Sequence, residues 1–181
     1  MPKRSVVLAR LSELYAQVPV LECRGLCAHS CAQAIDMSEA ERAHIAQVHR
    51  RRLPPSQDGE PGPCPALTTA GRCAVYADRP MICRLWGVSE GMVCPHGCRP
   101  GSAYLDAAQT LTLLIASLAA GGSAHHNLEQ INDLLESTRG SKEVAGLLLR
   151  LITGDQTALS HLPAAIARHR RSGRTSRPAV Q

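Results

Sequence analysis

Hydrophobic residues recur every three or four positions in two stretches near the start of the chain. The first is residues 5–17, where this spacing is typical of an amphipathic helix. The second begins at Ser38 and runs to about Arg51. Ser38 and Glu41 have the spacing of a capping box, in which each side chain accepts a hydrogen bond from the backbone of the other. We therefore predict two helices before Pro54, which ends the second one.

The last part of the chain has no cysteine after Cys98 and returns to helical spacing. Apolar segments separated by short polar or glycine-containing breaks predict helices at residues 102–119, 127–138, 141–152 and 156–170. Consecutive helices with short connections pack as antiparallel neighbours, so we expect these segments to form a small bundle.

The stretch between Cys64 and Cys98 has a different pattern. Two short extended runs, residues 65–67 and 73–76, flank a turn that contains Gly71. This arrangement predicts a small β-hairpin. A short helical turn is expected after the hairpin, because a proline there fits an early helical position.

The composition limits how this chain can build a core. Its 181 residues are enough for one compact domain, and 44% of them are hydrophobic, but only 2% are aromatic and none is Phe. Such a core lacks the large area that each aromatic ring buries. A bound metal could supply the missing rigidity, because the free energy of metal binding can act as folding free energy.

The opening of the chain does not have the pattern of a secretory signal. Arg10 and Glu13 are charged at positions where the apolar part of a signal would need no charge. No segment approaches the ~18 uninterrupted apolar residues of a membrane span. We therefore expect a cytoplasmic protein without membrane contact. In such a reducing compartment, clustered cysteines are more often metal ligands than disulfides.

The positive charge of the chain lies at its C-terminal end. The net charge is +5, and the segment from Arg168 onward carries five arginines and no acidic residue. We expect residues 168–181 to form a disordered basic tail, which could contact an acidic protein partner by charge. Nucleic acid is a weaker candidate, because so few aromatic residues leave no platform for stacking bases.

The cysteines are the clearest indication of a functional site in this sequence. The eight cysteines are Cys23, Cys27, Cys31, Cys64, Cys73, Cys83, Cys94 and Cys98. Thiolates are soft donors that favour zinc and iron–sulfur clusters, so we predict that all eight are metal ligands. They could complete two four-sulfur sites, or one cluster with spare cysteines for redox work. Gaps of three residues fit zinc sites and Cys-Pro pairs fit iron–sulfur ligation, so the spacing leaves both metals open.

Four other residues near these cysteines are candidates for the site. His29 and His96 could ligate the metal or hydrogen-bond to its ligands. Arg79 and Tyr76 are expected beside the ligands, where hydrogen bonds to sulfur would tune a cluster. No pattern identifies a catalytic residue, so enzyme activity is left open.

Part of this stretch resembles a known family. The segments that carry the resemblance are Cys64–Leu67, Gly71–Tyr76, Arg79–Pro80 and Cys83–Arg84. They are similar to the YkgJ-type cysteine-cluster family, which is described as a zinc- or iron-chelating domain. The resemblance covers about residues 20–100. It implies six ligand candidates, which are Cys23, Cys27, Cys31, Cys64, Cys73 and Cys83.

The chain also departs from this family. Many members carry an adjacent Cys-Cys pair where Cys31 is followed by Ala32 here, and Cys94 and Cys98 are additional. The ligand set can therefore differ from that of those members. A related domain occurs in flagellin lysine N-methylases, which carry an iron–sulfur cluster, and this resemblance gives an analogy with an enzyme.

These patterns predict a mainly α fold with a small β-hairpin, in which an irregular Cys-rich metal-binding core packs on a helical bundle. Residues 1–100 would form the metal-binding domain with its N-terminal helix, and residues 101–167 the helical part of the same compact unit, ahead of the tail. The expected function is that of a cytosolic metal-binding protein of unassigned pathway, holding an iron–sulfur cluster or Zn²⁺. Two alternatives stay open: a redox or protein-modifying enzyme or accessory that uses the cluster, and a zinc-stabilised interaction module.

Overall fold

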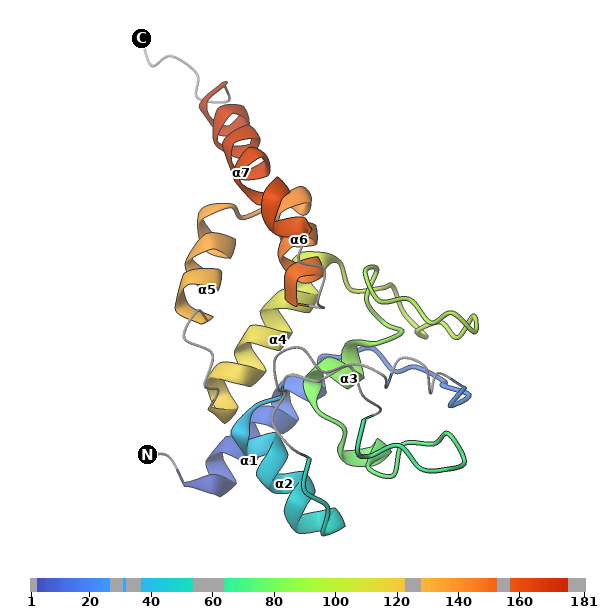
Figure 1. Cartoon of the computed structure of the whole chain (residues 1–181). Coiled ribbons are helices and arrows are strands. Elements are labelled where there is room, and N and C mark those ends of the chain that lie inside the picture. Colours follow the sequence, from blue (N-terminus) through green and yellow to red (C-terminus); the bar gives the residue numbers. More distant parts are fainter. Residues whose placement is uncertain are drawn as a thin grey trace.

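Helices make up the regular structure of this chain. The structure is a computed structural model that describes residues 3–26, 31, 37–53, 64–122, 128–152 and 157–175. In chain order (Figure 1), its helices are α1 (Arg4–Tyr15), α2 (Glu39–His49), the 3-10 helix η2 (Tyr76–Asp78), α3 (Met81–Leu85), α4 (Ala107–Gly121), α5 (Leu128–Ser137), α6 (Lys142–Ile152) and α7 (Ala158–Thr175). The mainly α fold predicted from the sequence is confirmed. No helix in the described ranges combines the length and the apolar character that crossing a membrane requires.

Helix α4 lies at the centre of the fold. It contacts α1, α2, α3, α5 and α6, and Figure 1 shows it between the α1–α2 pair and the C-terminal helices. Leu111 and Leu114 of α4 are buried in the main core, together with Met81 of α3 and Val144 of α6. Aliphatic side chains from distant parts of the sequence thus meet around one helix.

Both ends of α4 are fixed by specific contacts. At its start, Asp106 and Gln109 form a capping box, with hydrogen bonds of 2.8 and 3.0 Å between each side chain and the other residue's backbone N–H. At its end, Gly121 lies against Ser38 at the start of α2. A Cβ atom at Gly121 would lie 2.1 Å from the Ser38 Oγ, so a larger residue does not fit without displacing α2.

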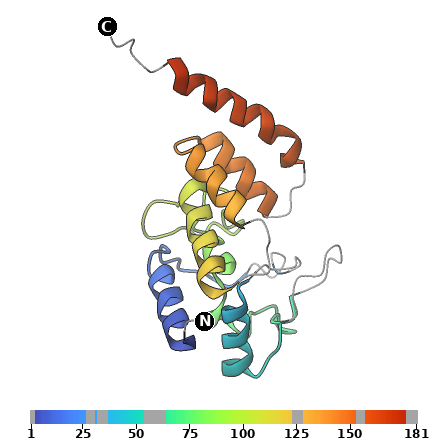
Figure 2. The same ribbon diagram turned by 90° about the vertical axis from the view of Figure 1, so that its left-hand side faces the viewer.

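The C-terminal helices α6 and α7 pack against each other, and α6 also packs on α4. Ala165 of α7 is buried in the main core, and Arg168 pairs with Glu143 of α6. Beyond this ion pair α7 continues to Thr175 and extends away from the other helices (Figure 2). The sequence predicted disorder from Arg168 onward, whereas the first part of that segment is helical; residues 176–181 lie outside the described residues.

The small β-hairpin predicted from the sequence is wrong. Leu67 and Cys73 form a single antiparallel bridge, and the described part of this segment contains no strand. The Thr68 N–H donates to the Arg72 carbonyl at 2.8 Å and closes a tight turn. After Cys73 the chain curls into η2 at Tyr76, so the second extended run is too short to continue the pairing. This loop therefore depends on other contacts for its shape.

Candidate metal centre

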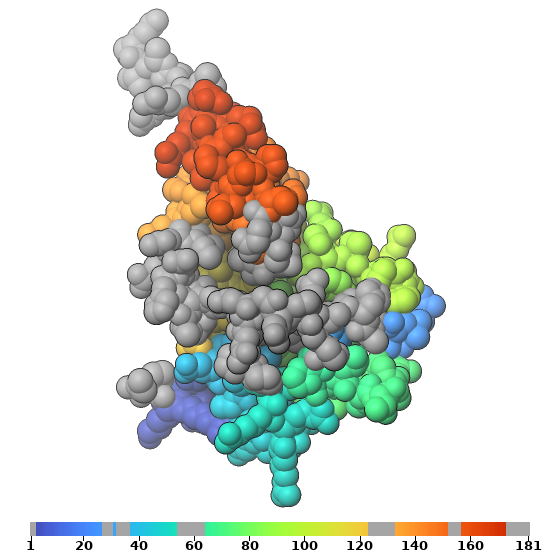
Figure 3. All heavy atoms as spheres, viewed as in Figure 1, coloured from blue at the N-terminus to red at the C-terminus, as the bar shows by residue number. Residues whose placement is uncertain are grey.

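Most of the described cysteines lie on irregular segments that gather on one side of the molecule, and Cys83 lies on α3. Segments around residues 20–26, 64–80 and 90–103 are found there side by side (Figures 1 and 3). The backbone carbonyl of Arg24 accepts a hydrogen bond from Arg72, and the Arg24 guanidinium donates to the His96 carbonyl at 2.6 Å. The first segment is thus tied to both of the others.

Seven of the eight cysteines fall within the described residues, and none of these seven forms a disulfide. Cys27 and His29, two of the predicted site residues, lie outside the described residues. The described thiols divide into one group of four, one pair, and Cys23. Cys23 accepts a hydrogen bond at 3.3 Å from the Gly25 N–H and also contacts Tyr76.

Four thiols from separate segments come together, and we call them the four-thiol group: Cys31, Cys64, Cys73 and Cys83. The Cys64 backbone N–H donates to the Cys31 carbonyl. Cys64 is buried in a second, smaller core with Ile45 of α2 and Val75, and Cys31 and Cys73 pack against this core. Cys83 enters the group from α3, whose Met81 and Leu85 belong to the main core. The group therefore lies where the two cores meet.

The thiols of this group perturb one another electrostatically. Burial is the main factor that raises the pKa of Cys31, and the charges of Cys64 and Cys73 raise it further. For Cys83, burial again comes first, and the other three thiols of the group push its pKa further above the ordinary value. Neighbouring thiolates repel each other and lose hydration on burial, so a cation among them would stabilise the charged form. The donor set is therefore chemically suited to a soft metal.

Within the residues that the structure describes, no three His, Cys, Asp or Glu side chains stand in a metal-holding arrangement.

Arg79 lies beside the four-thiol group and carries the opposite charge. Its guanidinium stacks on the Tyr76 ring, 4.1 Å from the ring centroid. Its charge counteracts the upward shift in the pKa of Cys73 and Cys83. The Arg79 Nε is buried and has no hydrogen-bond partner among the described residues. A buried N–H without an acceptor is costly, so this donor fits a site that receives negatively charged sulfur. The role of Arg79 and Tyr76 as neighbours of metal ligands stays a prediction.

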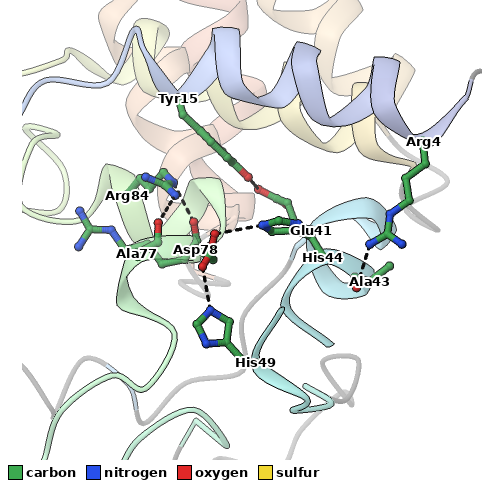
Figure 4. A network of polar contacts seen from close by, with 10 residues as sticks. Arg4, Tyr15, Glu41, Ala43, His44, His49, Ala77, Asp78 and Arg84 are labelled. Atoms are coloured by element: carbon green, nitrogen blue, oxygen red, sulfur yellow. Dashed lines mark hydrogen bonds and ion pairs between the residues drawn. The ribbon is translucent and has the colours of Figure 1, made fainter. Parts of the chain in front are cut away.

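A polar clamp fixes the segment that carries Arg79. The two carboxylate oxygens of Asp78 contact His44 Nε2 at 3.0 Å and His49 Nε2 at 2.8 Å (Figure 4). Both histidines belong to α2 and Asp78 ends η2, so the clamp joins these two elements. Arg84 adds hydrogen bonds of 2.8 and 2.7 Å to the carbonyls of Arg79 and Ala77. Together these contacts hold the backbone between Cys73 and Cys83 in place.

The clamp should make stability depend on pH in the acid range. Hydrogen bonds from His44 and then His49 lower the pKa of Asp78 below its ordinary value of 3.8. A carboxylate whose pKa falls on folding stabilises the protein above its ordinary value, and this contribution is lost as the pH drops through the lowered one. We therefore expect Asp78→Asn to lower the free energy of unfolding at pH 6, with the difference from the wild type shrinking below about pH 4.

Urea unfolding of both proteins across this pH range, under identical metal conditions, measures the difference directly. Glu90→Gln is a matched control, because Glu90 is an exposed acid in the same half of the chain. If Asp78→Asn has the same stability deficit at pH 3 and at pH 6, the clamp does not act through the carboxylate charge.

Cys94 and Cys98 form a separate pair in a turn. The Gly97 N–H donates to the Cys94 carbonyl at 3.1 Å, and Gly97 has a φ of +75°, which favours glycine. Hydrogen bonds from the backbone and the guanidinium of Arg24 lower the pKa of Cys98, and a hydrogen bond from Cys94 lowers it further. The turn places the His96 carbonyl against Arg24 rather than next to the four-thiol group.

Several residues that shape the site could not be singled out from the sequence. His44 and His49 stand five positions apart on α2, and this spacing does not match the three or four positions that mark one face of a helix. Arg24 is one of many arginines, and its partners Arg72 and His96 lie 48 and 72 positions away. Trp86, the single indole, packs against the main core, and its buried Nε1 has no partner among the described residues.

Comparison with known proteins gives one match. No curated protein and no solved structure matches this chain. The model of the CxxCxxCC family, described as "Putative zinc- or iron-chelating domain", matches residues 22–99. This range contains all eight cysteines. Residues 22–99 are therefore similar to the zinc- or iron-chelating domain that this family model describes.

Proposed function

We propose that the four-thiol group holds the metal of this domain, as one zinc ion or one iron–sulfur cluster. The observation that carries the proposal is that four thiols from distant positions meet closely enough to perturb one another's ionisation. Four cysteines are a complete ligand set for either metal. Cys94 and Cys98 lie outside this site.

The surroundings of the group support a metal with thiolate ligands. Four thiolates around a metal keep a net negative charge, and Arg79 offers both an opposite charge and an N–H without another acceptor. Hydrogen bonds to thiolate sulfur are a common way to tune a metal–sulfur site. The absence of disulfides among the seven described cysteines also fits a reducing compartment such as the cytoplasm.

The site's position suggests that the metal serves the fold. Cys83 extends from a helix in the main core, whereas Cys64 belongs to the second core. A metal bound by both residues would join the two cores. When four protein ligands fill a zinc site, no position stays open for a substrate, and the metal then contributes folding energy.

Metal content of the purified protein tests the proposal. Protein isolated without oxygen should hold zinc in a 1:1 ratio, or iron with sulfide, which gives a brown colour. Cys73→Ser should lose most of this metal, because three thiolates remain in the group. Cys94→Ser is the matched control and should keep it. Full metal content in Cys73→Ser would overturn the assignment of these ligands.

A further inference from the structure

Helix α7 has an apolar face that holds it on the fold. The apolar residues of this face follow one another at steps of four, three and one positions, and such steps place them on one side of a helix. They are Ala158, Leu162, Ala165 and Ile166. Two of them, Ala158 and Ala165, are buried in the main core, and the other two pack against it. The first half of α7 is therefore anchored on the core.

The second half of α7 is strongly basic. Residues 168–175 include four arginines and no aliphatic or acidic residue, and Figure 2 shows this part of α7 extending away from the other helices. Arg170 and Arg171 are exposed. Because successive residues of a helix turn by about 100°, Arg171 lies roughly opposite the apolar face and Arg170 lies to one side of it. Helix α7 thus presents positive charge to solvent.

Arg168, at the start of this basic half, shows how the helix binds a carboxylate. Its Nε donates to Glu143 Oε2 at 3.2 Å, and its Nη2 donates to the other carboxylate oxygen. Two parallel hydrogen bonds from one guanidinium to one carboxylate form a bidentate pair, which fixes both distance and orientation. Among the described residues, neither Arg170 nor Arg171 forms an ion pair.

The arginines of this half also repel one another. Like charges three or four positions apart destabilise a helix. Arg168 and Arg171 are three positions apart, and Arg170 and Arg174 are four apart. Glu143 compensates the charge of Arg168 only. Carboxylates placed against Arg170 and Arg171 would relieve the rest of this repulsion.

The charge of the whole chain favours a carboxylate partner over a nucleic acid. Binding to nucleic acid through phosphate contacts draws on many basic residues. The net charge of +5 equals the five arginines from Arg168 onward, so residues 1–167 are neutral overall and provide no further basic surface by net charge. Helix α7 has no Trp, Tyr or Phe on which a base could stack. The bidentate pair with Glu143 is, by contrast, a carboxylate contact made by the same helix.

We propose that the outward face of α7 binds an acidic segment of another protein, with Arg170 and Arg171 holding its Asp or Glu side chains. Arg170 and Arg174 are one helical turn apart, about 6 Å along the axis. A helical segment with acidic residues at every third or fourth position matches this spacing. The contact surface lies on α7 and excludes the four-thiol group, so this inference does not depend on the proposed metal site.

A fluorescent helical peptide with Glu at every fourth position tests the proposal on the full-length protein. Fluorescence anisotropy should show saturable binding that weakens as the salt concentration rises, because salt screens exposed charges. The same peptide with Gln in place of every Glu should not bind. The double substitution Arg170→Gln/Arg171→Gln should weaken binding of the acidic peptide by roughly fivefold or more, because it removes two exposed charge pairs.

The matched control is the double substitution Arg10→Gln/Arg52→Gln, which changes the net charge equally at two exposed arginines outside α7. It should bind the acidic peptide like the wild type. Gln is nearly as favourable as Arg in a helix, so circular dichroism should be the same for all three proteins. The proposal is overturned if the wild type does not bind the acidic peptide, or if both double variants lose affinity equally. It is also overturned if duplex DNA binds at a salt concentration at which the peptide does not, since the partner class would then be nucleic acid.

Discussion

Removing the metal should unfold the loop region around the four-thiol group while the helices around α4 stay folded. The second core contains few large side chains, and the loop from Cys64 to Cys73 holds only one β-bridge. Structural zinc contributes roughly 10 kcal/mol or more to the folding of small domains. The main core, by contrast, is built from residues of α1, α3, α4, α6 and α7 and includes none of the four thiols.

Hydrogen exchange with mass spectrometry resolves these two regions. After treatment with EDTA or 1,10-phenanthroline, peptides from residues 64–80 should lose protection, and peptides from α4 and α6 should keep it. Adding zinc, or rebuilding the cluster with iron and sulfide, should restore the original pattern. Equal loss of protection in both regions would mean that the metal supports the whole fold, and no loss would mean that it does not support the second core.

Replacing Glu41 should destabilise the protein more than any other single polar substitution in the clamp region. This buried carboxylate accepts hydrogen bonds from the Tyr15 hydroxyl at 2.7 Å, the Met81 N–H at 2.8 Å, and the N–H and hydroxyl of Ser38, both at 2.8 Å. It thus joins α1, α2 and α3 at one point, and Figure 4 shows its contact with Tyr15. Glu41→Ala leaves buried hydrogen-bond donors on three elements without a partner. We therefore expect it to lower the free energy of unfolding by about 3–5 kcal/mol.

Two other substitutions separate the parts of this effect. Glu41→Gln keeps the volume of the side chain but loses one acceptor oxygen, so it should lower the free energy of unfolding by about 1–3 kcal/mol. Tyr15→Phe removes one hydrogen bond and should cost about 1 kcal/mol, because the Tyr15 ring still stacks against Arg84. Denaturant unfolding of the three variants gives this ranking. If Glu41→Ala is no more harmful than Tyr15→Phe, the carboxylate does not join the helices.

Local rules account well for the helices. The capping box of Ser38 and Glu41 was predicted from two residues at the right spacing, and the structure confirms it. The predicted helix at residues 141–152 corresponds to α6, and its boundary is set by the Ser141 hydroxyl, which accepts from the Val144 N–H. These features depend on residues three or four apart, so a single sequence contains the information needed to find them.

The prediction of the hairpin was wrong because the local sequence pattern does not determine which strands pair. Residues 65–67 and 73–76 have the composition of strands, yet burial of Val75 in the second core and the turn into η2 redirect the chain. Tertiary contacts override strand propensity in this way when a segment is short. The polar clamp on Asp78 could not be predicted for the same reason, because His44 and His49 are far from it in sequence.

The sequence grouped the cysteines by their spacing, but the fold groups them by position in space. Cys94 and Cys98 repeat the spacing between Cys27 and Cys31, which suggested one common role. In the structure, Cys31 lies next to Cys64, whereas Cys94 and Cys98 lie next to each other and Cys98 interacts with Arg24. Neighbours in space come from loop paths that no short-range rule specifies, so the ligand roles of the eight cysteines stay predictions.

The path of the chain through the four-thiol group has a consequence for biosynthesis. Cys31 leaves the ribosome about fifty residues before Cys83, so during translation Cys31 is present before the group of four thiols is complete. An ion that arrives early would meet an incomplete set of donors and would be held weakly. If the four-thiol group holds the metal as proposed, productive loading has to follow synthesis of α3, and slow translation of this interval would leave nascent chains exposed to misplaced metal or oxidant.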